Sequence, residues 1–79
     1  MKVETLRLAL AALEGEYDKH VDYSRDAMDE AFRAEARGKD NLEFSLRAVS
    51  EYWDDRATQT FDAMQELEAA LDEAEKETA

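Results

Sequence analysis

The sequence predicts an all-α protein in which two long helices pack as an antiparallel hairpin. Proline is absent from the 79 residues, and glycine occurs only at Gly15 and Gly38. Residues that favour helices, such as Ala, Leu, Glu, Arg and Met, are abundant. Apolar residues recur at alternating spacings of three and four, the pattern of a helix face that packs against another helix. Strands find almost no support in this pattern.

The first helix is expected over about residues 3–36. Its apolar stripe consists of Leu6, Leu10, Leu13, Tyr17, Val21, Ser24, Met28 and Ala31. A helix of this length extends for about 50 Å. Gly15 is the one position where it would bend or break, because glycine costs about 1 kcal/mol relative to alanine inside a helix. A three-helix bundle with a break near Gly15 is therefore the structural alternative.

The stretch "ARGKDN" predicts a turn over residues 37–40. Gly38 suits the left-handed conformation that often follows a helix end, and Arg33 and Arg37 suit the negative end of the helix dipole. Asp40 or Asn41 can cap the next helix. A connection this short makes the two helices antiparallel neighbours.

The second helix is expected over about residues 41–76, which makes residues 1–79 a single helical domain. Its apolar stripe consists of Leu42, Leu46, Val49, Trp53, Ala57, Thr60, Met64, Leu67, Leu71 and Ala74. Trp53 is central in this stripe, so we expect it to be the largest core residue. Ser24 and Thr60 interrupt the two stripes with hydroxyls, which either fix the register of the helices or bond back to their own helix.

Apolar residues beside the stripes predict a further partner. Tyr23 and Tyr52 flank the stripes close to Trp53, which widens the apolar sector beyond what one neighbouring helix covers. A chain of 79 residues also buries only a modest core by itself. We therefore expect a homodimer in which two hairpins form a four-helix bundle, with Tyr23, Tyr52 and Trp53 as the apolar partner-binding residues.

The chain is strongly acidic, with 10 Lys and Arg against 21 Asp and Glu and a formal net charge of −11. This charge opposes direct binding to nucleic acid or to an anionic membrane surface, so a charged partner should be a protein with a basic surface. Acidic residues form outer rows on both helices. Those expected to face a partner are Asp18, Asp22, Asp26, Asp29, Glu51, Asp55, Asp62 and Glu66.

The stretch "EYDKHVDY" holds the only histidine and raises the question of a metal site. Glu16 and His20 share one side of the helix at i and i+4. Helical di-iron bundles use a Glu-x-x-His pair with glutamates from facing helices, whereas here the spacing is one residue longer and there is no second histidine. We expect a half-exposed His20 beside a carboxylate, and no metal or other cofactor. A metal-binding bundle remains as an alternative.

Catalysis has little support. No nucleophile is placed near a base with an orienting group, and no glycine-rich loop precedes a helix, so we expect no catalytic residues. The apolar stretch "LRLALAAL" is too short for a membrane span and contains Arg7. With no cysteine in the chain, these features lead us to expect a cytoplasmic protein.

Two functional hypotheses follow from these observations. In the first, the protein is a small non-catalytic interaction module, a homo-oligomeric helical adaptor that binds through its apolar flank. In the second, it is a nucleic-acid-mimicking inhibitor of the phage or plasmid anti-defence type. Such inhibitors act against restriction or CRISPR effectors, and the resemblance here is one of charge and rod shape.

Overall fold

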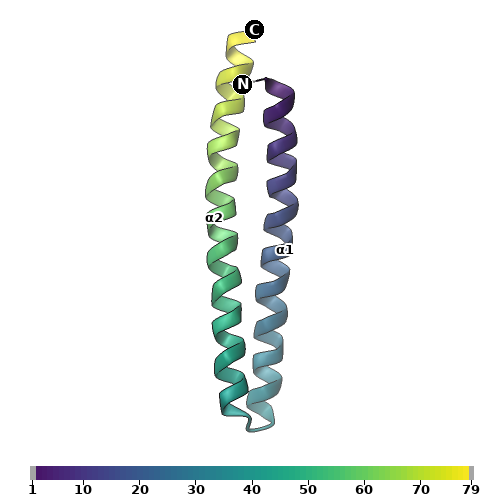
Figure 1. Ribbon diagram of the computed structural model, residues 1–79, viewed down its shortest axis with the longest axis vertical. Helices are drawn as coiled ribbons and strands as arrows, with labels where there is room; N and C mark the ends of the chain where they lie inside the picture. Colours follow the sequence, from purple (N-terminus) through teal and green to yellow (C-terminus); the bar gives the residue numbers. More distant parts are fainter. Residues whose placement is uncertain (1, 79) are drawn as a thin grey trace.

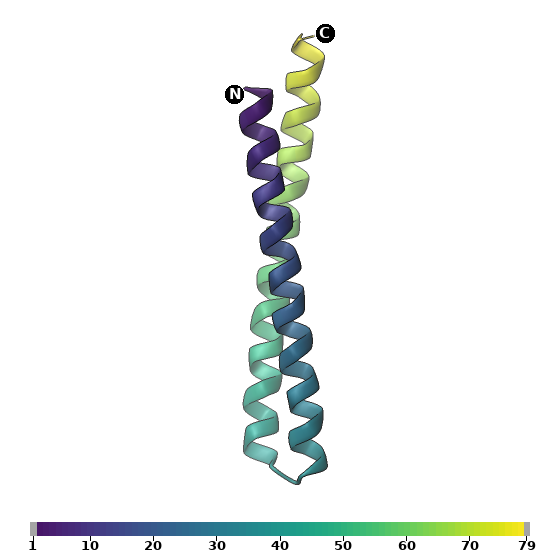
Figure 2. The ribbon, with the colours of Figure 1, turned by 90° about the vertical axis from the view of Figure 1, so that its right-hand side faces the viewer.

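The computed structural model describes residues 2–78, and these form a hairpin of two helices. Helix α1 spans Val3–Ala36 and helix α2 spans Asp40–Thr78. The helices lie side by side along their length, with the turn at one end and both termini at the other (Figures 1 and 2). The Cα atoms occupy 61 × 14 × 12 Å, the shape of a rod. The predicted all-α antiparallel hairpin is confirmed.

Helix α1 continues without interruption through Gly15, so the three-helix alternative is wrong. Gly15 is exposed, and the apolar residues on either side of it face α2. A propensity cost of about 1 kcal/mol at one exposed position is small beside the packing of a whole helix face. The long helix is therefore held by its neighbour rather than by local preference at this residue.

The turn ends α1 through the backbone of Gly38, whose φ of 71° is the left-handed conformation that glycine adopts without strain. The Gly38 N–H donates to the Glu35 carbonyl at 3.0 Å, and the Lys39 N–H donates to the Ala34 carbonyl at 2.9 Å. These bonds satisfy carbonyls that the helix end would leave unpaired. Asp40 is the first residue of α2 rather than the residue that precedes it, so its carboxylate lies in the first turn, where the helix dipole favours negative charge.

The interface between the helices follows the predicted heptad pattern: all eight residues predicted for the stripe of α1, and eight of the ten predicted for that of α2, are buried or half-buried. His20, Ala27 and Ser50 are buried, at places where the sequence favoured the neighbouring Val21, Met28 and Val49. Leu42 and Val49 were predicted for the seam, but they are 45% and 43% exposed. Because the apolar spacing alternates between three and four, either of two adjacent residues can lie closest to the other helix at each turn. At these three turns the residue beside the predicted one is the more deeply buried.

Small side chains at this interface bring the two backbones close together. The Ser24 hydroxyl donates to the Ser50 carbonyl at 3.0 Å, and the Ser50 hydroxyl donates to the Ser24 carbonyl at the same distance. Thr60 instead donates back to the Arg56 carbonyl of its own helix at 2.9 Å. Ser24 therefore bonds across to the other helix, whereas Thr60 bonds back to its own helix and also lies 3.2 Å from the Nδ1 of His20 in α1. The reciprocal serine bonds link α1 to α2 at a defined register.

Candidate functional site

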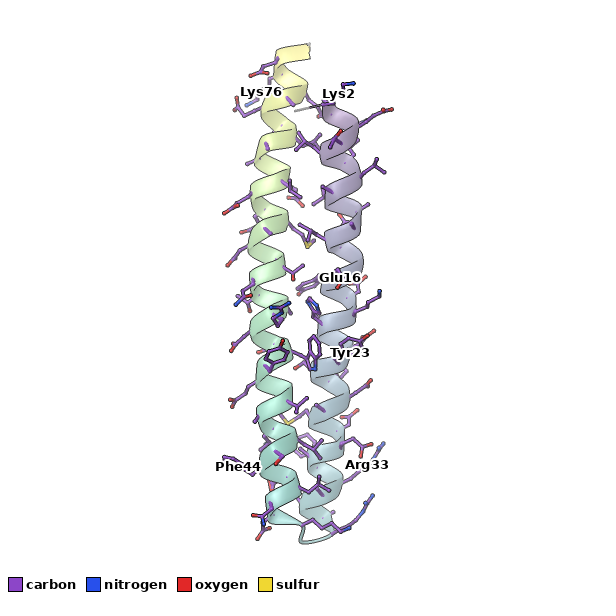
Figure 3. All side chains as sticks on the ribbon, in the orientation of Figure 1. Lys2, Glu16, Tyr23, Arg33, Phe44 and Lys76 are labelled. Carbon is purple, nitrogen blue, oxygen red and sulfur yellow. The ribbon has the colours of Figure 1, made fainter. Side chains whose placement is uncertain are left out.

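Trp53 is the centre of a cluster of rings contributed by both helices. Its ring centroid is 4.9 Å from that of Tyr23, 5.0 Å from that of Tyr52 and 5.4 Å from that of His20. Figure 3 labels Tyr23 near the middle of α1. The structure thus brings together the three apolar residues singled out in the sequence, two from α2 and one from α1. Trp53 is only half-buried, so the expectation that it is the largest core residue is wrong.

The cluster continues along α2 as an exposed apolar surface. Leu42 and Val49 lie seven residues apart and therefore share a side of the helix, next to Tyr52 and Trp53. Tyr23 and Tyr52 are 46% and 53% exposed. We call the surface formed by Tyr23, Leu42, Val49, Tyr52 and Trp53 the aromatic face.

Arg56 is the charged residue beside this face on α2. Its guanidinium carbon is 5.9 Å from the centroid of the Tyr52 ring, within the range of a cation–π contact. This contact spreads the long Arg56 side chain over the ring. The charge therefore lies along the border of the aromatic face and is compatible with burial of the rings beside it.

His20 is buried beneath Trp53, with an exposed fraction of 8%, so the expectation of a half-exposed histidine is wrong. Its Nδ1 is 3.2 Å from the Thr60 Oγ1, and its Nε2 is 3.5 Å from the Glu16 Oε2. Because the Thr60 hydroxyl already donates to a carbonyl, its oxygen is placed to accept from the His20 Nδ1–H. The Glu16 contact is an ion pair only in the protonated imidazole, in which both ring nitrogens carry a proton. Within residues 2–78 no group of three or more His, Cys, Asp or Glu side chains is placed to hold a metal ion.

The eight carboxylates of the predicted outer rows are all exposed. They lie on the sides of α1 and α2 that face away from the other helix, as their spacing from the buried residues requires. In the described part of the chain none of the eight forms an ion pair or a side-chain hydrogen bond. The ion pairs use other acids, such as Glu75 with Arg7 at 2.9 Å and Glu43 with Arg47 at 2.9 Å. Within the described residues, the carboxylates of the outer rows are therefore not neutralised by ion pairs with basic side chains.

A groove that the sequence reasoning missed lies on the side of the hairpin away from the aromatic face. It consists of two adjoining hollows of about 380 and 210 Å³ that share Val21 and Asp54 as lining residues. Ser24, Ser50 and Met28 line the larger hollow, together with Arg25 and Asp29 at its edge. Tyr17, Ala57, Thr58 and Phe61 line the smaller one. The sequence feature that could have predicted this groove is a series of small residues at the seam with large apolar residues beside them.

Neither helix contains, within residues 2–78, a stretch long and apolar enough to cross a membrane. The chain matches no protein-family model, no curated protein and no solved structure.

Proposed function

We propose that the protein is a non-catalytic, homo-oligomeric helical adaptor, in which two copies cover each other's aromatic faces to form a four-helix bundle. The observation that carries this proposal is the aromatic face itself. Four of its large side chains are between 43% and 53% exposed on one side of the rod. Contiguous apolar surfaces of this kind are typical of protein interaction sites.

The total exposed area supports a partner of the size of a second hairpin. The chain exposes 5856 Å², whereas a compact protein of its mass exposes about 4,900 Å². The excess of about 1,000 Å² is close to the roughly 800 Å² that each partner loses in a standard protein interface. A second hairpin laid along the rod would cover an area of this order.

The side of α2 that borders the aromatic face is suited to a second copy. At steps of seven residues it carries Leu42, Val49, Arg56, Ala63 and Ala70. A flank that combines large apolar side chains with alanines accepts the same flank of another copy, because large residues fill the space beside small ones. Its single charge is the arginine that lies over Tyr52.

The test is the mass in solution, measured by light scattering after size exclusion at low and high salt. We expect about twice the chain mass of 9.0 kDa, and no dissociation in salt, because apolar contacts are not screened. Tyr23→Ala and Tyr52→Ala should shift the protein towards monomer. Phe44→Ala is the matched control: Phe44 is 78% exposed and projects away from the rod near the turn end (Figure 3), so its loss should change nothing. A monomeric wild type, or dimers that persist in both tyrosine variants, would contradict the proposal.

The second candidate is the nucleic-acid-mimicking inhibitor, favoured by the eight exposed carboxylates that have no partner within the described residues. Rows of uncompensated negative charge on a narrow rod suit a basic nucleic-acid-binding channel. The test is inhibition of DNA binding by purified restriction and CRISPR effectors. Reversal of Asp18, Asp22 and Asp26 to Lys should abolish inhibition. Inhibition that does not weaken as salt is raised would count against this function.

A further inference from the structure

We propose that the groove on the side away from the aromatic face binds a basic amphipathic helix of another protein. This inference rests on the proposed adaptor function and deepens it by naming the second partner. The aromatic face would hold the two copies together, while the groove stays open on the outer side of each hairpin.

The dimensions of the groove suit a helix of a few turns. Its two hollows, of about 380 and 210 Å³, join at Val21 and Asp54. Along α1 the lining residues run from Tyr17 to Asp29, a stretch of about 18 Å at 1.5 Å per residue. A bound helix would place about three apolar side chains along this length, in the manner of helices that dock into grooves with anchors at i, i+3 or i+4, and i+7.

The groove exists because its floor is made of small residues. Ser24, Ser50 and Ala57 lie at the seam, where the two backbones approach each other. Phe61 stands beside them at 44% exposure and packs against Tyr17, with ring centroids 5.9 Å apart. Large side chains next to small ones leave a hollow between the helices.

The polar groups in the floor are already satisfied. Each serine hydroxyl donates to the carbonyl of the other serine at 3.0 Å. Among the described residues, no buried side-chain nitrogen or oxygen lacks a hydrogen-bond partner. Apolar side chains could therefore enter the groove without leaving a polar group buried and unpaired, which would cost free energy.

The charge around the groove selects a basic partner. The lining includes Asp29 and Asp54, which form no ion pair in the described part of the chain, and Arg25. The lining itself therefore carries a formal net charge of −1, and the two segments that supply it, residues 17–29 and 50–62, carry −5 when all their sides are counted. A helix with Lys or Arg beside its apolar anchors is attracted to these acids, and an acidic helix is repelled.

The probe is a fluorescein-labelled peptide of about 16 leucines and lysines, with the leucines at helical spacing and both ends blocked. Its binding to the full chain is measured by fluorescence anisotropy. We expect saturable binding of one peptide per chain. A peptide of the same composition with its leucines spread around the helix should bind about tenfold more weakly, and one with Glu in place of Lys should not bind. Absence of saturable binding, or equal binding of the rearranged peptide, would overturn the proposal.

Paired charge reversals locate the site. Asp29→Lys with Asp54→Lys should weaken peptide binding about tenfold. The control is Asp26→Lys with Glu66→Lys, which changes the net charge equally at exposed carboxylates outside the groove lining and should weaken binding less than about twofold. Equal losses in the two variants would mean diffuse attraction to the acidic surface and would overturn the groove as the site.

Light scattering on the same variants separates this inference from the adaptor function. Tyr52→Ala should lose self-association and still bind the peptide, whereas the Asp29 and Asp54 reversal should lose peptide binding and remain dimeric. A monomeric wild type that binds the peptide in the groove would contradict the proposed self-association and would leave the proposed peptide site standing. If the Asp29 and Asp54 reversal dissociates the dimer, the groove is the surface between copies, and the proposal of a basic helix is overturned.

Discussion

At the scale of single residues, backbone conformation decides whether replacing a glycine raises or lowers the free energy of unfolding. A β-carbon added at Gly15 or at Gly38 would meet no other atom within 4 Å, so neither change creates a clash. Gly38 has a φ of 71°, which other residues adopt only with strain, whereas Gly15 lies inside α1 with no positive φ. We predict that Gly15→Ala raises the free energy of unfolding by about 1 kcal/mol. Gly38→Ala should lower it by about 1–2 kcal/mol.

Urea denaturation followed by circular dichroism measures both changes. The protein concentration must be the same for every variant, because self-association makes apparent stability depend on it. Each glycine serves as the control for the other, since both gain one methyl group in open space. Changes of the same sign in the two variants would contradict this account of the turn.

At the scale of elements, the close packing of α1 on α2 depends on alanines near the turn. Ala31 is 0% exposed and Ala34 is 2% exposed. We predict that Ala31→Leu lowers the free energy of unfolding by about 1–3 kcal/mol, because a larger side chain forces the helices apart. Ala48→Leu, on the exposed side of α2, should change it by less than about 0.5 kcal/mol. Equal effects of the two changes in urea denaturation would show that the helices are not closely packed there.

Arg47 links the two helices near the same end. It donates to Glu43 at 2.9 Å and to Glu35 of α1 at 3.3 Å, and its guanidinium carbon lies 5.5 Å from the Phe32 ring centroid. The hydrogen bond with Glu43 is the main cause that raises the pKa of Arg47 above its ordinary value. Because folding raises this pKa, the stabilising contribution is present across neutral pH and would be lost only in strongly alkaline solution. The Arg47 guanidinium and Glu35 are exposed and Glu43 is half-buried, so solvent screens the pairs and this contribution is modest.

At the scale of the whole molecule, the net charge of −11 opposes the compact state through self-repulsion. We predict that the melting temperature rises as sodium chloride is raised from about 0.02 to 0.5 M, because salt screens exposed charges. Asp22→Asn with Asp55→Asn should raise the melting temperature at low salt and have little effect at high salt. Calorimetry at one protein concentration measures both. A melting temperature that falls with salt would mean that the surface ion pairs outweigh the repulsion.

Local features of the sequence were sufficient to predict the two helices and the turn. The absence of proline, the helical spacing of apolar residues and Gly38 all act on backbone within a few residues of themselves. The exposure of the outer acids also followed from the sequence, since charged side chains opposite an apolar stripe stay in water. Gly15 misled about the continuity of α1, because packing along the whole helix outweighed its propensity cost.

The sequence by itself determined that this chain is an acidic pair of helices joined by a tight turn, because propensity and charge are properties of each segment alone. Only the tertiary structure decided which residues are buried most deeply at the seam. The deeper burial of His20 than of Val21, and of Ser50 than of Val49, depends on what the facing helix presents. Close approach of the backbones lets Ser24 and Ser50 bond reciprocally. The same approach leaves Trp53 half-buried and opens the groove, because large side chains that do not fit the narrow seam must lie beside it.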